Sequence, residues 1–198
     1  MTLPDDPAGL DAGEDARLVA RCRSDPAQFS LLYRKYLAPV YRYHLARSGS
    51  HPEAEDLTSQ TFLAALERLP RYREQGCFAA WLFSIARRKS ADHHRRPPAA
   101  SLDSSLFDEQ PRLDLAAARE LCGDPFDALV AGEERRLLQT ALDELDPTTR
   151  ELLELRFAAR LPFDQIAALL DRKPSAVKMA VYRALQRLAR QLEADHAR

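Results

Sequence analysis

Apolar residues recur at steps of three and four along most of this chain, and this spacing limits its fold more than any other feature. A clear run is Phe29, Leu32, Tyr33, Tyr36 and Val40. Such steps place side chains on one face of an α-helix, whereas a half-buried strand would alternate apolar and polar residues. The sequence has no clear alternating run and no Asn-Gly hairpin signal. We therefore expect an all-α fold.

Proline marks several expected helix starts, because its fixed backbone angle suits the first turn. Asp25-Pro26, His51-Pro52 and Asp146-Pro147 are three such places. The expected helices cover residues 14–24, 26–47, 52–69, 78–95, 126–145, 147–158, 162–170 and 174–192. The last two are joined only by residues 171–173, a separation that suits a helix-turn-helix.

The formal net charge of −1 hides a segregation of charge along the chain. Residues 68–96 carry eight basic and two acidic residues, and residues 171–198 carry seven basic and three acidic residues. Between them, residues 97–134 carry nine acidic residues, two arginines and several prolines. We therefore expect two small helical domains, 14–96 and 126–198, with a flexible tail at 1–13 and an acidic flexible linker at 97–125.

One side of the expected 52–69 helix collects polar and acidic residues. At about 100° per residue, Ala54, Leu57 and Phe62 fall on the core side. The opposite side carries Glu53, Asp56, Gln60, Leu63 and Glu67. Two interpretations remain open: a solvated acidic surface with one exposed leucine, or a docking face for a basic partner protein with Leu63 as its apolar anchor.

The segment from residue 71 to residue 96 mixes cations with aromatic and amide side chains. Cations can follow the phosphates of a single nucleic-acid strand, while aromatic and amide groups can stack on or bond to unpaired bases. The candidate residues are Arg71, Tyr72, Arg73, Gln75, Phe83, Arg87, Arg88, His94, Arg95 and Arg96. In the alternative interpretation, Trp81 and Phe83 belong to the core and the cations form a solvated helix end.

The expected 174–192 helix divides into an apolar and a polar side. The apolar stripe is Val177, Val181, Ala184, Leu185, Leu188 and Leu192. A helix that is held on one side and reads DNA on the other needs this division. Candidate DNA contacts on or beside the polar side are Lys173, Ser175, Lys178, Met179, Tyr182, Arg183 and Arg187. Arg183 has the chemistry to pair with a guanine edge, and Lys178 and Arg187 to hold phosphates.

Several motifs, taken in order, resemble extracytoplasmic-function (ECF) sigma factors of the sigma-70 family. Region 2 is matched by Phe29-x-x-Leu32-Tyr33-x-x-Tyr36, Ala54-Glu55-Asp56-Leu57-Thr58-Ser59-Gln60-Thr61-Phe62, Phe78-Ala79-Ala80-Trp81-Leu82-Phe83-Ser84-Ile85-Ala86-Arg87 and Asp92-His93-His94-Arg95-Arg96. Region 4 is matched by Leu145-Asp146-Pro147, Gln165-Ile166-Ala167 and Ala176-Val177-Lys178. Lys173 and Met179-Ala180 depart from the family pattern, in which a capping serine and Ser-Arg are common.

This resemblance implies an alternative sigma factor that binds core RNA polymerase, directs it to specific promoters and assists promoter melting. It implies docking of the Glu53, Asp56, Gln60 and Leu63 face on the coiled coil of the largest subunit, and contact with the beta flap. Residues 71–96 would capture the single-stranded minus-ten element, and the 174–192 helix would read the minus-thirty-five duplex. An anti-sigma factor is a common regulator in this family. The chemistry of RNA synthesis would belong to the polymerase, so no catalytic residue, cofactor or metal is expected.

Two other classes of function remain as alternatives. A stand-alone helix-turn-helix regulator would explain the 162–192 segment but neither the Asp56 face nor the first cationic region. An enzyme or metal site would have to use His93 and His94 with Asp92, or His44 and His51. Adjacent histidines on a helix do not share a face as an i, i+4 pair does, and the sequence shows no further ligand cluster.

The sequence also indicates the cellular location of the protein and the state of its cysteines. No apolar stretch approaches the roughly 18 residues of a membrane-spanning helix, and the acidic start lacks the features of a secretory signal, so we expect a cytoplasmic protein without membrane insertion. Cys22, Cys77 and Cys122 form no C-x-x-C pair and are expected to be free thiols.

Overall fold

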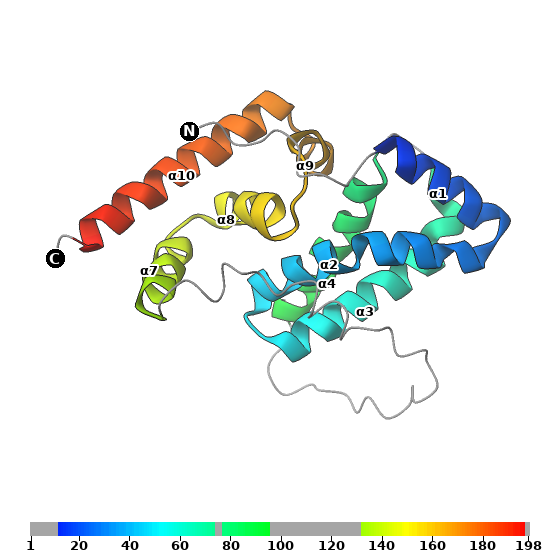
Figure 1. The fold of residues 1–198 in the computed structure, drawn as a ribbon, viewed down its shortest axis with the longest axis horizontal. Coiled ribbons are helices and arrows are strands. Elements are labelled where there is room, and N and C mark those ends of the chain that lie inside the picture. The colour runs from blue at the N-terminus through cyan, green and yellow to red at the C-terminus, as the bar shows by residue number, and fades with distance from the viewer. Residues whose placement is uncertain (1–11, 74–76, 96–131, 197–198) are drawn as a thin grey trace. The chain divides into compact units, whose positions relative to one another are not determined.

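The computed structural model describes residues 12–73, 77–95 and 132–196, and every regular element within these ranges is a helix (Figure 1). The elements are α1 (Ala12–Ser24), η1 (Pro26–Gln28), α2 (Phe29–Ser48), α3 (His51–Arg68), η2 (Leu69–Arg71), α4 (Phe78–Arg95), α7 (Gly132–Asp143), α8 (Pro147–Leu153), η4 (Glu154–Ala158), α9 (Phe163–Leu170) and α10 (Pro174–His196). The all-α prediction is confirmed for the described residues. The expected linker at 97–125 lies outside them.

The chain divides into two compact units. The N-terminal unit contains α1 to α4, and the C-terminal unit contains α7 to α10. No helix in the described ranges is both long and apolar enough to cross a membrane.

Short polar side chains begin the helices near the expected prolines. Asp25 accepts a hydrogen bond from the Ala27 amide at 3.0 Å, and Asp146 accepts one from the Thr149 amide at 2.9 Å. Ser50 is the N-cap of α3, which therefore begins at His51, one residue before its expected start. These caps satisfy amide groups that have no partner within the first turn of a helix. Gly49 ends α2 with a left-handed φ of 67°, which glycine adopts without a Cβ clash.

Aromatic side chains dominate the core of the N-terminal unit, where α2, α3 and α4 pack against one another and α1 packs on α2 and α4. Tyr36, Tyr43, Phe78 and Phe83 are fully buried. The rings of Tyr43 and Phe83 meet edge to face with their centroids 5.6 Å apart, a favoured aromatic arrangement. Helices α2, α3 and α4 therefore form one continuous core.

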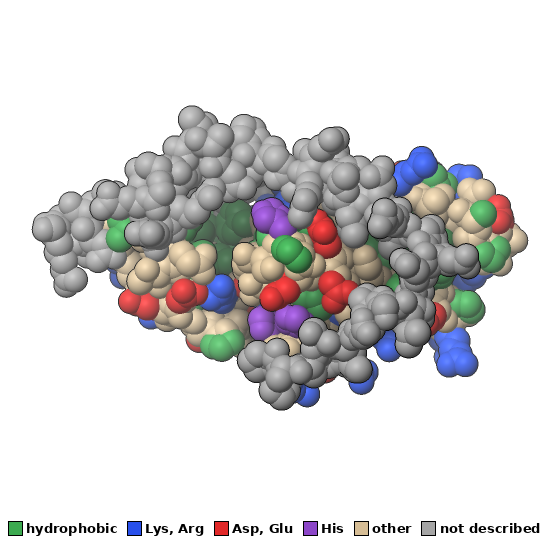
Figure 2. Space-filling view, turned by 90° about the horizontal axis from the view of Figure 1, so that it is seen from below, with side chains coloured by type: hydrophobic (Ala, Val, Ile, Leu, Met, Phe, Trp, Pro, Cys, Tyr) green, Lys and Arg blue, Asp and Glu red, His purple; other side chains and the backbone are tan. Residues whose placement is uncertain are grey.

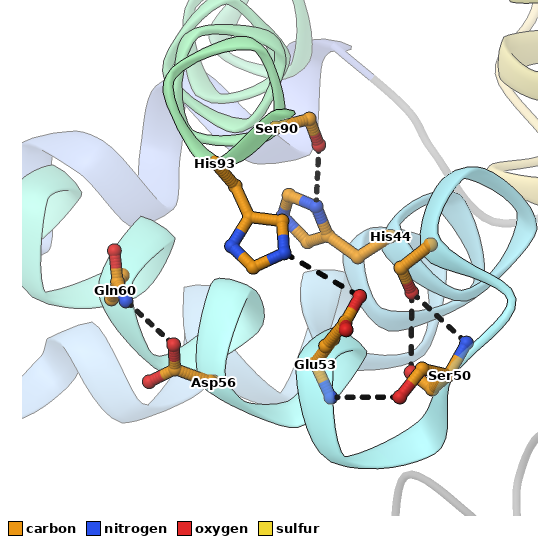
Figure 3. A network of polar contacts seen from close by, with 8 residues as sticks. His44, Ser50, Glu53, Asp56, Gln60, Ser90 and His93 are labelled. Atoms are coloured by element: carbon orange, nitrogen blue, oxygen red, sulfur yellow. Dashed lines mark hydrogen bonds and ion pairs between the residues drawn. The ribbon is translucent and has the colours of Figure 1, made fainter. Parts of the chain in front are cut away.

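A polar contact inside this core joins three helices. His44 of α2 is fully buried, and its Nδ1 lies 3.0 Å from the Ser90 hydroxyl of α4, a contact drawn in Figure 3. Its Nε2 lies 3.0 Å from the Thr61 hydroxyl of α3. Both ring nitrogens therefore have a partner, as buried polar groups require.

The C-terminal unit is built around α10, which packs against α7, α8 and α9. Val177, Val181 and Leu188 of α10 are buried, as are Leu152 of α8 and Ile166 of α9. The apolar stripe of the sequence is confirmed at Val177, Val181, Ala184 and Leu188, while Leu185 and Leu192 are only half-buried. One side of α10 is therefore held by the unit.

The helix expected over residues 147–158 is present over that whole range, but its second half is not α-helical. α8 ends at Leu153, and residues Glu154–Ala158 form a π-helical turn, η4. Arg156 of this turn is buried, donates a hydrogen bond from Nη1 to the Leu161 carbonyl at 3.0 Å, and lies 4.3 Å from the centroid of the Phe163 ring. The wider turn thus accompanies a buried arginine that periodicity does not reveal.

Candidate nucleic-acid and protein interfaces

The acidic face of α3, defined as Glu53, Asp56, Gln60 and Leu63, lies on one side of a helix whose other side is buried. Glu53, Asp56 and Leu63 are exposed and Gln60 is half-buried. Gln60 donates a hydrogen bond from Nε2 to Asp56 Oδ2 at 2.7 Å (Figure 3). This contact orients the Asp56 carboxylate but leaves the group at the surface.

The acidic face contacts the end of α4 through Glu53 and His93. Glu53 Oε2 lies 3.4 Å from His93 Nε2, and both side chains are partly exposed (Figure 3). The amide of Glu53 also donates to the hydroxyl of Ser50, the α3 cap, at 3.5 Å. Figure 2 shows histidine and acidic side chains lying side by side on the face that it presents.

A second exposed leucine of α3 was missed in the sequence analysis. Leu66 is 43% exposed and Leu63 is 39% exposed, three positions apart on the same helix. Residues i and i+3 are neighbours on a helix surface. The acidic face therefore borders an apolar pair rather than one leucine, a feature that counting the exposed apolar positions of α3 would have found.

The cationic end of α4, defined as Arg87, Arg88, His94 and Arg95, follows the buried first half of that helix. Arg88, His94 and Arg95 are exposed and Arg87 is half-buried. Arg88 Nε lies 3.9 Å from Asp92 Oδ2, and the Arg88 side chain is 73% exposed. Such an open pair leaves the guanidinium accessible to another anion. Arg96 and Gln75 lie outside the described residues.

Two aromatic candidates for strand contact are buried. Phe83 has no exposed surface, because α4 is packed against α1, α2 and α3 rather than along one stripe. Of the two interpretations given for Phe83, its burial therefore favours the core. Tyr72 is 7% exposed, and its ring lies 4.8 Å from that of Trp81. The flanking Arg71 and Arg73 are exposed.

The recognition face of α10 comprises residues opposite or beside its buried stripe. Lys173, Ser175, Met179, Arg183 and Arg187 are exposed, and Lys178 and Tyr182 are half-buried. Met179 is the most open large apolar side chain among these, at 52% exposed. Lys178 Nζ lies 5.9 Å from the centroid of the Phe163 ring of α9. All seven candidates on this helix and its preceding turn therefore keep surface accessible to solvent.

The turn between α9 and α10 has the short, closed form expected of a helix-turn-helix. Asp171 adopts a left-handed φ of 51°, and the Arg172 amide donates to the Ala167 carbonyl at 2.9 Å. α10 begins with Pro174, and its first amide bonds go to the Lys173 carbonyl, at 3.0 Å from Ala176 and 3.1 Å from Val177. A main-chain oxygen thus starts the helix at the position where the family commonly has a serine.

The geometry gives no support to a metal centre. Within the described ranges, no three His, Cys, Asp or Glu side chains are grouped so that they could hold a metal ion. His93 and His94 have their ring centroids 5.9 Å apart at an interplanar angle of 70°.

Each of the two units matches a known protein family. Residues 32–97 match Sigma-70 region 2, and residues 135–188 match Sigma-70, region 4. The first match covers α2 to α4, which a stand-alone helix-turn-helix regulator would not explain, so the sigma-factor interpretation is favoured.

Individual relatives agree with these matches. The chain is 36% identical over 191 residues to the ECF RNA polymerase sigma factor BldN of Streptomyces coelicolor, covering 95% of this chain and 69% of that protein. Its fold is similar to that of CnrH, solved in complex with the cytosolic domain of CnrY, with a TM-score of 0.63 at 24% identity, covering 93% of this chain and 99% of CnrH. It is also similar to RpoE of Bartonella quintana, solved with the anti-sigma factor NepR, with a TM-score of 0.55 at 21% identity, covering 84% of this chain and 98% of RpoE.

Family matches to both units and a relative of this similarity agree with the motifs found in the sequence. The chain belongs to the ECF sigma factors of the sigma-70 family, and it is an alternative sigma factor that directs RNA polymerase.

Proposed function

We propose that the acidic face of α3 docks on the coiled coil of the largest subunit of core RNA polymerase. The exposed carboxylates of Glu53 and Asp56 suit a basic partner surface, and the Leu63 and Leu66 side chains provide apolar area at the same place. Charge complementarity of this kind steers association, while apolar contacts add affinity. The exposure of this mixed surface next to the cationic end of α4, within one compact unit, is the observation that carries the proposal.

We further propose that Arg71, Arg73 and the cationic end of α4 hold the separated minus-ten strand. These side chains provide positive charge at the surface, and binding of a single strand to cations releases counterions. Strand opening needs no nucleophile here, because a protein that binds only the open form shifts the melting equilibrium toward it. Tyr72 and Phe83 support this surface from the core and are not proposed to contact DNA.

In the C-terminal unit, the recognition face of α10 is proposed to read the minus-thirty-five element as duplex DNA. Arg183 and Met179 point away from the buried stripe, and Lys178 and Arg187 flank it. An exposed arginine on a helix in the major groove can make a bidentate contact with guanine. The departures at Lys173 and Met179 are expected to give this protein its own upstream preference.

Further partners are proposed from the family and its relatives. The C-terminal unit would contact the beta flap of the polymerase, and an anti-sigma factor would hold the protein inactive in the cytoplasm. The complex of RpoE with NepR supports such a partner. The catalytic chemistry would remain with the polymerase.

Purified protein mixed with core RNA polymerase from its own source tests the proposal. Co-elution from a size-exclusion column, followed by transcription from discrete start sites on genomic DNA, is the expected result. A folded protein that elutes apart from the polymerase and binds DNA as a dimer would instead identify a stand-alone regulator.

A further inference from the structure

Helix α1 precedes the segment that matches Sigma-70 region 2, yet it is an integral part of the N-terminal unit. The match begins at residue 32, whereas α1 covers Ala12–Ser24. α1 packs on both α2 and α4. The surfaces proposed above do not include any residue of α1, so its contribution to function is unassigned.

A buried polar cluster fixes α1 on α2. The Tyr36 hydroxyl donates to Asp15 Oδ2 at 2.5 Å, and Lys35 Nζ lies 2.8 Å from Asp15 Oδ1. Tyr36 is fully buried and Asp15 is 1% exposed. A carboxylate taken out of water is strongly unfavourable without such partners. This cluster therefore determines where α1 lies along α2.

From Tyr36, aromatic contacts lead to the segment that precedes α4. The Tyr36 and Phe78 ring centroids are 5.5 Å apart, and those of Phe78 and Tyr72 are 5.8 Å apart at 90°. Tyr72 also packs on Trp81 of α4. The Tyr72 ring is thus packed on Phe78 and Trp81 of α4, and Phe78 in turn contacts Tyr36 of α2, while the flanking Arg71 and Arg73 remain exposed.

The last turn of α1 reaches the same segment directly. Arg23 donates a hydrogen bond from Nη2 to the backbone carbonyl of Tyr72, 49 positions further along the chain. A bond from a charged donor is stronger than one between neutral groups. It acts on the main chain between the two arginines, so it influences where both of their side chains point.

We propose that α1 positions the capture segment, defined as Leu69–Arg73, and that Arg23 is a positioning residue for capture of the minus-ten strand. The inference rests on the proposed role of Arg71 and Arg73. Arg23 itself acts through the main chain of Tyr72, and the Asp15 cluster supplies a fixed base for it.

The test uses the full chain assembled with core RNA polymerase. A promoter is first identified by sequencing the transcripts that the wild-type holoenzyme makes on genomic DNA. The probe is a fluorescent single-stranded oligonucleotide of its non-template minus-ten element. Arg23→Gln is expected to bind this strand about tenfold more weakly, since loss of a charged hydrogen bond is sufficient for a change of that size. Arg23→Lys, which keeps a charged donor, should recover most of the affinity.

Arg21→Gln is the matched control. Arg21 lies on the same exposed helix end, and its Nη2 donates to Gln28 Oε1 at 2.7 Å within the α1–η1 corner. The Arg21→Gln variant should bind the single-stranded oligonucleotide with wild-type affinity. Polymerase affinity should be unchanged in all three variants, and each variant should stay fully folded at the temperature of the binding assay, because a purely structural role for Arg23 would lower polymerase affinity or unfold the N-terminal unit.

Three outcomes would overturn the inference. If the Arg23→Gln variant bound the strand with wild-type affinity, Arg23 would have no positioning role. An equal loss in Arg21→Gln would indicate a general charge effect. If unfolding or weaker polymerase binding of Arg23→Gln accounted for its loss of strand affinity, α1 would serve only the stability of the fold. An Arg71→Ala/Arg73→Ala variant separates this inference from the proposed function, because normal strand binding by that variant would contradict the capture role itself.

Discussion

The imidazole of His44 is held between two hydroxyl groups inside the N-terminal unit, and this environment makes stability depend on pH. Burial, with smaller contributions from the nearby charges of Arg47 and His93, lowers the pKa of His44 from 6.5 to about 3. Between those values the unfolded chain binds a proton at this residue and the folded chain does not. Acidification in this range therefore favours the unfolded state.

The contribution of neutral His44 to stability is fully present above about pH 6.5 and is lost as the pH falls toward 3. We expect the free energy of unfolding to fall by up to about 1.4 kcal/mol per pH unit from this group. Urea unfolding at several pH values between about 7.5 and about 5 measures the slope. His44→Gln should flatten it, whereas His94→Gln, at an exposed position, should keep the wild-type slope; equal slopes in all three proteins would contradict this account.

The Asp56 carboxylate offers a second test at the level of a single residue. Asp56→Ala removes an exposed charge and its contact with Gln60, so the fold should be retained while affinity for core polymerase falls roughly tenfold. The loss should shrink at high salt, which screens exposed charges. Binding of a labelled protein to core polymerase measures it. Asp164→Ala, which removes an exposed acid of α9, is the control; unchanged affinity for Asp56→Ala would argue against the docking face.

At the level of helices, the local spacing of apolar residues predicted where a helix lies better than it predicted which of its side chains are buried. The expected helix at residues 78–95 agrees with the bounds of α4, Phe78–Arg95. The sequence left Phe83 between a strand-contact and a core interpretation, whereas in the structure α4 contacts three other helices and this side chain is buried. How many neighbours surround a helix depends on tertiary packing, which a single periodic pattern does not contain.

The local spacing of apolar residues also did not predict whether a helical segment is α, 3₁₀ or π. The expected helix at 26–47 is divided into the 3₁₀ turn η1 and α2, and the expected helix at 147–158 into α8 and the π-helical turn η4. These forms differ by one residue per turn or less, so their apolar patterns overlap. The choice in η4 accompanies the burial of Arg156 against Phe163, two residues seven positions apart.

Two residues after the end of η4, Arg160 adopts an unfavourable backbone conformation. Arg160 has a φ of 56°, and the Leu161 amide after it donates to the Leu155 carbonyl at 3.0 Å. Only glycine adopts such an angle without cost, so Arg160→Gly should raise the free energy of unfolding by about 0.5–1 kcal/mol. Chemical unfolding measures the change. Arg190→Gly, within α10, should lower it by about 1 kcal/mol, and destabilisation by both substitutions would refute the strain argument.

The recognition face of α10 gives a functional prediction for this element. Arg183→Ala removes an exposed guanidinium opposite the buried stripe, so stability should not change. Transcription that depends on the upstream element should fall about tenfold or more, the usual cost of losing a bidentate base contact. Paired promoters with and without that element separate this effect from a general loss. Arg160→Ala is the arginine control; an unchanged ratio between the two promoters for Arg183→Ala would remove its assigned role.

For the whole molecule, the division into two units should confine the destabilising effect of a core substitution to the unit that contains it. Phe83 packs against Tyr43 within the N-terminal unit. Phe83→Ala should destabilise that unit by about 3–5 kcal/mol through lost burial and a cavity. Hydrogen exchange of the full chain, followed unit by unit, should show faster opening of α2 to α4 and unchanged protection in α8 to α10. Equal loss of protection in both units would mean that the chain unfolds as one.

The candidate surfaces of the whole chain were predictable to the extent that they lie on single helices. The acidic face of α3 and the recognition face of α10 each follow from one helix and its spacing. The contact from Arg23 to the Tyr72 carbonyl joins positions 49 apart, and the Tyr72 ring is buried against the rings of Phe78 and Trp81 of α4. Such contacts arise only when the helices assemble, so no local pattern predicts them.

The separation of buried and exposed sides in α10 lets its exposed side chains change independently of the residues that hold the helix. Val177, Val181 and Leu188 hold the helix, while Met179, Arg183 and Arg187 contribute little to its packing. Given the proposed role of α10 in reading the upstream element, substitutions at the second set are expected to change the promoter sequence that the protein prefers while leaving the fold intact. After gene duplication, two copies can diverge to serve different genes through a few codons, and a designer can build insulated transcription circuits by randomising the same positions.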